Sequence, residues 1–326
     1  MTSQSITVGR LFTVVVASRC DDARSELLKR ACDSVRAMAA DLDYSIIVVA
    51  NGPRVSQSVL DWLATRPDVR VIRLRTGSYP LARRIGAEMA DSEFLAFLDD
   101  DDELFPNTLE RKVAFFREHP DIDVLVTDGV RVSGTTESMI FPPPELRDAD
   151  LVKTMMHAGW SACSMTLRAR NIDLSAFDAE FRHLEWTYAA LQLARRYRFG
   201  YLDEPTYRYY EGTLNSLWKD ADHCSAALDV WRRLSKTYAG TAYESTVRRR
   251  FGHACHIASW EFVGRGRVRD AWRLHIMSLS APGGLAALPY SAKLLFASAR
   301  GRFGAGVSGL DNSHVNPKQP NGGPAN

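Results

Sequence analysis

The stretch Phe94–Pro106, FLAFLDDDDELFP, constrains the fold of this chain more than any other. Its apolar half predicts a buried strand, and four consecutive aspartates follow at the carboxyl end of that strand. Because side chains alternate along extended backbone, Asp99 and Asp101 are expected to point to one side. Asp100 and Asp102 are then expected on the other. Two unit charges about 4 Å apart repel by ~4 kcal/mol near a protein surface, so the block predicts either a bound cation or a solvated acidic turn.

Apolar runs and helical patterns alternate around this stretch. Apolar, β-branched runs predict strands at 11–17, 45–50, 69–74 and 94–98. Helical spacing predicts helices at 24–40, 59–64 and 81–90, and another that has Pro106 in its first turn. This alternation predicts an α/β fold, with a mostly parallel, Rossmann-like sheet flanked by helices. The aspartates then lie at the edge where open α/β sheets bind ligands.

The second half of the chain changes character. Further strands are predicted at 124–128, 130–133, 160–167 and 199–202, a helix at 184–196, and a long loop or an insertion at 141–144, which contains three consecutive prolines. From about Asp222 to about Ala299 apolar residues recur with helical spacing, interrupted at 264–266 and 282–284. We therefore expect an α/β domain over 1–221, a C-terminal helical region over 222–302 and a disordered tail over 303–326.

Composition narrows the class of protein. The formal net charge is only +2, which does not favour a nucleic-acid partner. Five widely spaced cysteines without a CxxC pair fit a reducing compartment. The sequence shows neither a secretory signal nor an apolar run of about 18–20 residues, so we expect a cytoplasmic protein.

Three common kinds of site are not indicated. A GxGxxG motif does not follow the first strand, and a Walker A loop is absent from the sequence. His253 and His256 are spaced i, i+3 but lack an accompanying carboxylate motif, so surface or core histidines are favoured over a zinc site.

Four motifs in a fixed order carry a family resemblance. They are TVVVASR at 13–19, IIVVANG at 46–52, LARRIG at 81–86 and FLDDDD at 97–102. This succession resembles the GT-A fold glycosyltransferases of family 2. Two later segments resemble the same family more weakly, FDAEFRHLEW at 177–186, on the acceptor side, and the aromatic YRYY at 207–210.

The resemblance implies a nucleotide-sugar donor and a divalent cation, Mn²⁺ or Mg²⁺, which neutralises the leaving diphosphate. It assigns the metal to Asp99 and Asp101, with Asp102 in an assisting role. It places donor binding on Ala17, Ser18, Arg19, Asn51, Arg83, Asp99 and Asp100. The alternative for Arg83 is an ordinary salt bridge to Asp91 or Glu88.

One departure concerns the nucleotide base. Many family members have two acidic residues before the glycine where this chain has Ala50 and Asn51. An asparagine offers both a donor and an acceptor to a base edge, so base binding is retained while uridine specificity is not predicted.

Inversion at the anomeric carbon needs a base that takes the proton of the acceptor hydroxyl. The resemblance assigns this role to Glu185, with Asp178 and His183 as reserve candidates. Only one carboxylate is available, because Leu184 stands where the family often has a second acid. The alternative for Glu185 is an acidic residue favoured by the dipole in the first turn of a helix.

The leading hypothesis is therefore an inverting glycosyltransferase that acts on a hydroxyl-bearing acceptor. The alternatives are a catalytically silent nucleotide-binding or scaffold protein and, less favoured, a nucleotidyltransferase. The segment 286–299 with its flanking arginines leaves two possibilities open. One is peripheral contact with an anionic membrane, at the inner membrane face, and the other is packing on the catalytic domain or on a second copy of the chain.

Most of the aromatic residues that could line an acceptor site are expected in the core. The five residues that could line such a site are Trp160, Tyr207, Tyr209, Tyr210 and Trp218.

Overall fold

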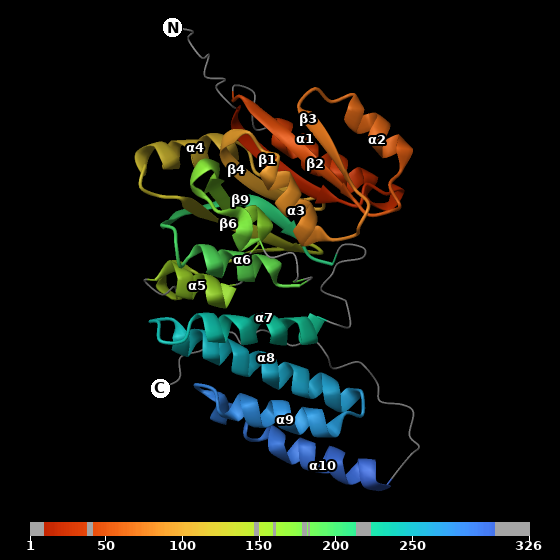
Figure 1. Ribbon diagram of the computed structural model, residues 1–326, viewed down its shortest axis with the longest axis vertical. Coiled ribbons are helices and arrows are strands. Elements are labelled where there is room, and N and C mark those ends of the chain that lie inside the picture. The colour runs from red at the N-terminus through yellow and green to blue at the C-terminus, as the bar shows by residue number, and fades with distance from the viewer. Residues whose placement is uncertain are drawn as a thin grey trace.

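One mixed sheet organises the described part of the chain (Figure 1). The computed structural model describes residues 10–37, 42–146, 150–158, 161–177, 181, 183–212 and 223–303. Nine strands lie in the order β3-β2-β1-β4-β8-β6-β9-β5, and β7 pairs with β6. They are β1 (Arg10–Ser18), β2 (Tyr44–Asn51), β3 (Val69–Leu74), β4 (Ser92–Asp99), β5 (Glu103–Leu104), β6 (Val124–Ser133), β7 (Thr136–Met139), β8 (Met165–Arg168) and β9 (Phe199–Tyr210).

The first four strands form a parallel unit. β1 lies between β2 and β4 and is parallel to both, and β3 is parallel to β2. The register pairs Ala17 with Asp99 and Ser18 with Ala50, so three strand ends meet at one edge. β6 and β9 are also parallel, and the antiparallel pairs all involve the short strands β5, β7 and β8. The α/β class with a mostly parallel sheet, predicted from the alternating pattern, is confirmed.

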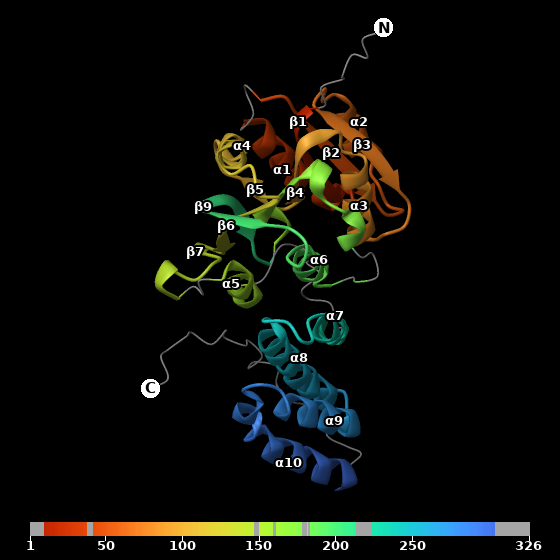
Figure 2. The same ribbon diagram turned by 60° about the vertical axis from the view of Figure 1, so that its left-hand side comes forward.

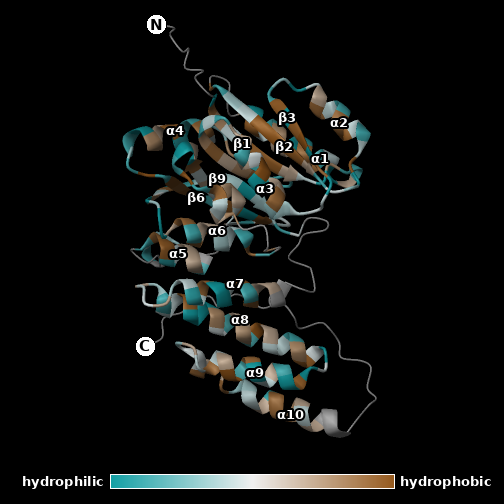
Figure 3. Ribbon diagram, in the orientation of Figure 1, coloured by the Kyte–Doolittle hydropathy of each residue, from teal (hydrophilic) through white to brown (hydrophobic). Residues whose placement is uncertain are grey.

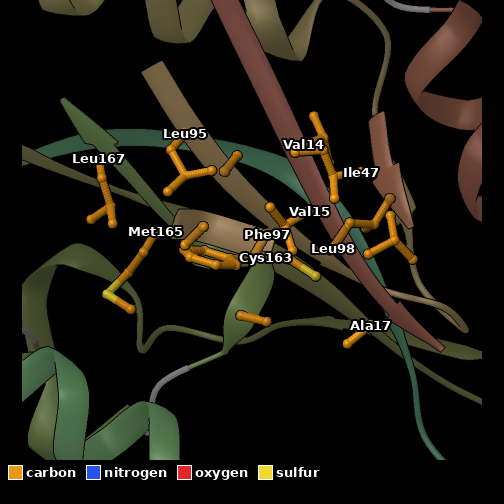
Figure 4. Close-up of a cluster of buried hydrophobic side chains, with 14 of the residues drawn as sticks. Val14, Val15, Ala17, Ile47, Leu95, Phe97, Leu98, Cys163, Met165 and Leu167 are labelled. Atoms are coloured by element: carbon orange, nitrogen blue, oxygen red, sulfur yellow. The ribbon is translucent and has the colours of Figure 1, made fainter. Parts of the chain in front are cut away.

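The core lies on both faces of β1 and β4. Figure 4 shows Val14 and Val15 of β1 and Phe97 of β4 among the buried apolar side chains of this core. The ring of Phe94 stacks on Phe116 at a centroid distance of 4.7 Å. A parallel strand covered on both faces requires a near-continuous apolar sequence, which explains the β-branched run TVVVA in β1.

Helices connect the strands of the α/β domain. They are α1 (Ser25–Ala37), α2 (Gln57–Ala64), α3 (Tyr79–Glu88), α4 (Thr108–Glu118), α5 (Leu151–Ala158) and α6 (Glu185–Leu193), with short 3₁₀ turns η1 (Asp22–Arg24), η2 (Pro144–Leu146), η3 (Ala162–Ser164), η4 (Ala169–Asn171) and η5 (Leu174–Ala176). α3 lies so close to the sheet that a Cβ atom at Gly86 would be 2.4 Å from Cγ1 of Val15.

The C-terminal region is helical, as the spacing predicts. It comprises α7 (His223–Thr237), α8 (Glu244–Gly264), α9 (Val268–Leu279), η7 (Gly284–Ala287) and α10 (Tyr290–Phe303). Both predicted interruptions coincide with the connections on either side of α9. Figures 1 and 2 show these helices stacked away from the sheet, beyond α5 and α6. Within the described residues, no helix combines the length and apolarity that crossing a membrane requires.

A second apolar cluster joins this region to the α/β domain. Tyr188 and Leu191 of α6 pack with residues of α7 and α8, and the hydroxyl of Tyr238 donates a hydrogen bond to the carbonyl of Leu191. The predicted boundary between 221 and 222 lies outside the described residues and stays a prediction. The same holds for the predicted disorder of the tail beyond Phe303.

Four local predictions were wrong, for identifiable reasons. The two strands predicted at 124–133 are one strand with a register shift near Gly129, where the absence of a Cβ atom leaves room for the ring of Tyr207. α4 starts at Thr108 rather than at Pro106, after the left-handed Asn107 with φ 58°. In the described part of 160–167, residues 162–164 form a 3₁₀ turn and only the end is strand. The region after the prolines contains α5, a helix that the pattern did not reveal.

The close approach of α3 to the sheet predicts the effect of Gly86→Ala. The new methyl group must displace the buried side chain of Val15, so the free energy of unfolding should fall by about 1–3 kcal/mol in urea denaturation. Gly264→Ala is the control, because Gly264 ends α8 and a Cβ atom added there would meet no atom within 4 Å. It should be neutral or stabilise by up to about 1 kcal/mol. An equal effect of the two changes would contradict the packing argument.

Candidate active site

The four aspartates differ in burial. β4 ends at Asp99, and the chain then turns, with the amide of Asp102 donating to the carbonyl of Asp99 at 3.1 Å. Asp100 and Asp102 are each 1% exposed. The side chains of Asp99 and Asp101 are 28% and 18% exposed. Burial therefore alternates along the four aspartates, although the backbone forms a turn here and does not continue the strand on which the expected side-chain directions were based.

Asp100 anchors the segment that follows β1. Its carboxylate accepts hydrogen bonds from Oγ of Ser18 at 2.6 Å and from Nε of Arg24 at 3.2 Å, and it forms an ion pair with Nη2 of Arg24. The same Nη2 lies 3.3 Å from the carboxylate of Asp101. Burial raises the pKa of Asp100, and the Arg24 guanidinium opposes that shift. One buried arginine thus compensates part of the charge of the acidic turn.

Asp102 connects the acidic turn to the other half of the sheet. Its carboxylate accepts a hydrogen bond from the amide of Tyr210 in β9 at 3.2 Å and one from Sγ of Cys163 in η3 at 3.4 Å. Burial raises the pKa of Asp102, and the charges of Asp99 and Asp101 raise it further. These contacts fix the turn from both sides of the sheet.

Arg83 links the aspartate edge to α6. Its Nη2 donates to Asp99 at 2.5 Å, and its Nη1 forms an ion pair with Glu185. The residue is 7% exposed, and its guanidinium lies 5.0 Å from the ring centroid of Trp186. The alternative pairing with Glu88 belongs instead to the next residue, Arg84, at 2.8 Å. A single guanidinium therefore separates two carboxylates that the sequence assigned to different roles.

Glu185 is the first residue of α6, and the backbone before it is unusual. Leu184 adopts the left-handed conformation, with φ 55° and ψ 23°. This conformation costs a non-glycine residue roughly 1–2 kcal/mol, and such residues concentrate at functional sites. Burial raises the pKa of Glu185, whereas the Arg83 guanidinium lowers it. The position of the Glu185 carboxylate fits both interpretations of the sequence, a catalytic base and an acidic residue in the first turn of a helix.

Two hollows of different size bear on the site, and the smaller one is lined by Arg83 and Glu185. A cavity of about 10 Å³, room for one water molecule, is lined by Pro80, Arg83, Phe177, Glu185 and Trp186. An open depression of about 600 Å³ lies where β1 and β2 end, which is within the size range of small-molecule sites. It is lined by Arg19, Asp21, Asp22, Ala23, Arg54, Val55 and Ser56.

The donor set for a metal ion is limited but chemically suitable. Within the described ranges, no group of three or more histidine, cysteine or acidic side chains is arranged to hold a metal. Of the four aspartates, Asp99 and Asp101 retain exposed carboxylate surface. Magnesium is commonly held by one or two carboxylates together with substrate phosphates, so this pair fits a cation that binds with a diphosphate.

Comparison with known proteins identifies the family. The Glycosyl transferase family 2 model matches residues 14–173, a segment that begins within β1 and includes β2 to β4 and the acidic turn. The chain carries a family 2 glycosyltransferase domain. This confirms the family predicted from the four motifs, and it makes the chain a glycosyltransferase.

Solved structures share the fold of this glycosyltransferase. S. aureus TarS 1–349 superposes with a TM-score of 0.61 at 16% identity, covering 89% of this chain and 88% of that chain. The complex of TarS 1–349 with UDP-GlcNAc gives 0.62 at 16% identity over the same shares, and the complex with UDP gives 0.56 at 15% identity. The likeness confirms the predicted GT-A fold. Among the curated proteins, none matches the chain significantly.

Several residues that the sequence assigned to donor binding are enclosed by the glycosyltransferase domain itself. Ala17, Ser18 and Asn51 are at most 2% exposed. The amide oxygen of Asn51 accepts a hydrogen bond from the backbone of Ser78 at 2.9 Å, at the start of α3. Arg19, in contrast, lines the open depression and is paired with Asp21 at 3.2 Å. A bound donor would therefore meet the Arg19 side chain more readily than those of the other three.

The remaining candidate residues differ in burial, and some lie outside the described residues. His183 is 4% exposed and precedes the left-handed Leu184, whereas Asp178 lies outside the described residues. Tyr207 is fully buried, as expected for a core residue, while Tyr209 and Tyr210 are half-buried. Trp160 and Trp218 also lie outside the described residues.

Sequence reasoning missed Arg24 and Cys163. Arg24 follows the polar loop after the first strand, so the sequence was sufficient to infer that it lies near the edge of the sheet. Its pairing with Asp100, 76 positions away, depends on tertiary structure. Cys163 lies in a segment predicted as strand, and nothing in its neighbourhood suggested a partner for Asp102.

Lys112 of α4 gives a test by pH. It is fully buried, its Nζ has no hydrogen-bond partner among the described residues, and burial lowers its pKa to about 8. Below pH 8 the folded protein therefore holds a buried charge, and stability should rise between pH 8 and the ordinary lysine value of 10.5. Lys112→Met should stabilise by about 1–4 kcal/mol at pH 7, and the gain should shrink as pH rises from 8 to 10.

Urea unfolding at several pH values measures this difference. Lys236→Met, at the exposed end of α7, is the control and should change stability by less than about 0.5 kcal/mol. A gain for Lys112→Met that does not change with pH would contradict the argument.

Proposed function

We propose that the glycosyltransferase domain moves a sugar from a nucleotide-diphosphate donor to an acceptor hydroxyl with inversion at the anomeric carbon. The Arg83 bridge supports this most directly. It brings Asp99, at the carboxyl edge of the sheet, and Glu185, at the start of α6, to the two ends of one guanidinium. Inversion needs a base on the face of the sugar opposite the leaving diphosphate, and the bridge holds the candidate base close to the candidate metal ligand.

The nucleotide is assigned to the open depression beside the ends of β1 and β2. Its volume suits a nucleoside, and Arg19 and Arg54 supply cationic side chains for phosphate oxygens. The structural likeness to a TarS complex with UDP-GlcNAc makes uridine diphosphate sugars the first donors to test. Ser18 and Asn51 act indirectly in this assignment, since their side chains hold Asp100 and the start of α3.

A divalent cation, Mn²⁺ or Mg²⁺, is assigned to Asp99 and Asp101, the two aspartates with exposed oxygen. When bound there, it supplies positive charge to the departing diphosphate. Asp100 and Asp102 hold the turn in place through Arg24, Ser18, Cys163 and Tyr210. Because Asp100 and Asp102 are buried, the cation is assigned to Asp99 and Asp101.

Glu185 is assigned as the base that takes the proton of the acceptor hydroxyl. Arg83 opposes the effect of burial on its pKa and so favours the ionised form that a base requires. The negative charge of a bound diphosphate competes for the same guanidinium. Donor binding therefore draws Arg83 from Glu185 and leaves the carboxylate free to accept a proton, beside the rings of Trp186 and Phe177.

Thermal shift with a panel of nucleotide diphosphate sugars tests the donor and the metal assignments together. UDP-sugars with Mn²⁺ should raise the melting temperature by several degrees, since ligand binding stabilises the native state. Asp101→Asn should lose the metal-dependent part of this shift. Asp121→Asn, an exposed residue paired with Arg198 at 3.0 Å, is the matched control and should keep it. If the metal-dependent shift persisted in Asp101→Asn, the assignment of the metal to this site would be wrong.

Glu185→Gln tests the base. Glutamine can still accept a hydrogen bond from Arg83, so donor binding should persist while transfer falls by about 10²–10⁴-fold. Glu204→Gln is the control, since Glu204 is 45% exposed and paired with Arg111. Radiolabelled sugar transfer, with donor affinity measured in parallel, separates the two effects. Unchanged turnover in Glu185→Gln would exclude it as the base.

A nucleotide-binding protein without transfer activity is the second candidate. It is suggested by Leu184, which stands where the family often has a second acid and leaves Glu185 without a neighbouring carboxylate at the base position. Donor binding without either transfer or donor hydrolysis in the wild-type chain would support this alternative over the enzyme.

A further inference from the structure

The end of the helical region exposes large apolar side chains. Leu285 and Leu288 are 73% and 55% exposed, and Leu295 and Phe296 are 62% and 74% exposed. We call these four residues the α10 surface. Four aliphatic or aromatic side chains so exposed within twelve residues form a feature that soluble surfaces seldom carry without a partner.

The orientation of α10 explains this exposure. Tyr290 and Leu294 face the protein, where they pack with Ala271 of α9. Hydrogen bonds from Trp272 to Ser298 at 2.9 Å and between His275 and Ser291 at 2.7 Å hold the helix in place. The exposed positions Ala292, Leu295, Phe296 and Ala299 follow i, i+3, i+4, i+7 spacing. The apolar stripe of α10 therefore faces outward.

The charge of this part of the chain is one-sided. Residues 271–310 contain four lysines and arginines and no aspartate or glutamate, which gives the segment a formal charge of +4. Because the whole chain has only +2, the rest of the sequence is net acidic. Lys293 lies beside the apolar stripe, with its Nζ 4.6 Å from the ring centroid of Trp260, and Arg273 of α9 is also exposed.

We propose that the α10 surface rests on an anionic lipid bilayer. An outward apolar stripe beside basic side chains is the combination that lies flat at a membrane interface, with apolar groups among the acyl chains and cations at the headgroups. Figure 3 shows apolar residues along α10, and Figure 1 places α10 at the opposite end of the molecule from the sheet. In this orientation the candidate active site stays clear of the lipid.

Charge argues against the other occupants. A symmetric dimer through this surface would bring two segments of charge +4 together without an acidic side chain in either. Residues 304–326 contain three large apolar residues, Val307, Leu310 and Val315, too few to cover the surface. An anionic bilayer satisfies both the apolar and the cationic groups.

Flotation of the full chain with vesicles tests the proposal. Vesicles of phosphatidylcholine with about one third phosphatidylglycerol should carry the protein upward, and pure phosphatidylcholine should do so more weakly. Leu295→Ser with Phe296→Ser should lower the partition coefficient about tenfold or more, since both side chains leave the bilayer. Met139→Ser is the matched control, because Met139 is 47% exposed on β7, remote in sequence and fold from α10. Lys293→Gln should cost roughly fivefold and weaken the salt dependence.

Each other outcome overturns the proposal. Binding of the Leu295, Phe296 double variant at the level of Met139→Ser would exclude the α10 surface as the contact. The wild type could instead fail to float and form a dimer in analytical ultracentrifugation. If the double variant lost that dimer, the surface would be assigned to a second copy of the chain. Flotation only after truncation at Phe303 would assign it to the tail. Equal melting temperatures of the variants confirm that the changes act at the surface.

Discussion

The Arg83 guanidinium, buried between Asp99 and Glu185, is the interaction on which the geometry of the site depends. A buried cation is tolerated only with paired carboxylates, and removing one partner from such an arrangement typically costs about 3–5 kcal/mol. Because Arg83 comes from α3, Asp99 from β4 and Glu185 from α6, their mutual pairing fixes three elements at once. The close contact of Gly86 with Val15 completes this constraint, since it sets the distance of α3 from the sheet.

A second buried pair organises the other side of the acidic turn. Arg24 compensates Asp100 and lies 3.3 Å from Asp101, while Asp102 accepts hydrogen bonds from two neutral donors, the amide of Tyr210 and the thiol of Cys163. The two buried aspartates therefore act as structural anchors, and the two exposed ones keep carboxylate oxygen at the surface. Four adjacent carboxylates are compatible with a stable fold because the turn separates them into these two environments.

The sequence was sufficient for the elements whose signal is local. Strands β1 to β4 lie within two residues of the predicted limits, because their apolar runs are continuous and their ends are polar. The break at Gly264 to Gly266 was likewise readable. What could not be predicted depends on partners distant in sequence. Asn51 faces Ser78 instead of solvent, and Arg24 meets Asp100. The left-handed Leu184 is also invisible to a pattern of apolar residues, since leucine ordinarily favours a helix.

The C-terminal helical region helps to hold helix α6 in place. Trp186 and Ala190 belong to the core of the sheet, whereas Tyr188 and Leu191 belong to the cluster formed with α7 and α8. The helix that begins with Glu185 is thus held between two cores, and each fixes a different face of it. A carboxylate next to a strained backbone needs such support, because the strain at Leu184 persists only where the surroundings determine the conformation. The position of the candidate base therefore depends on packing by both regions.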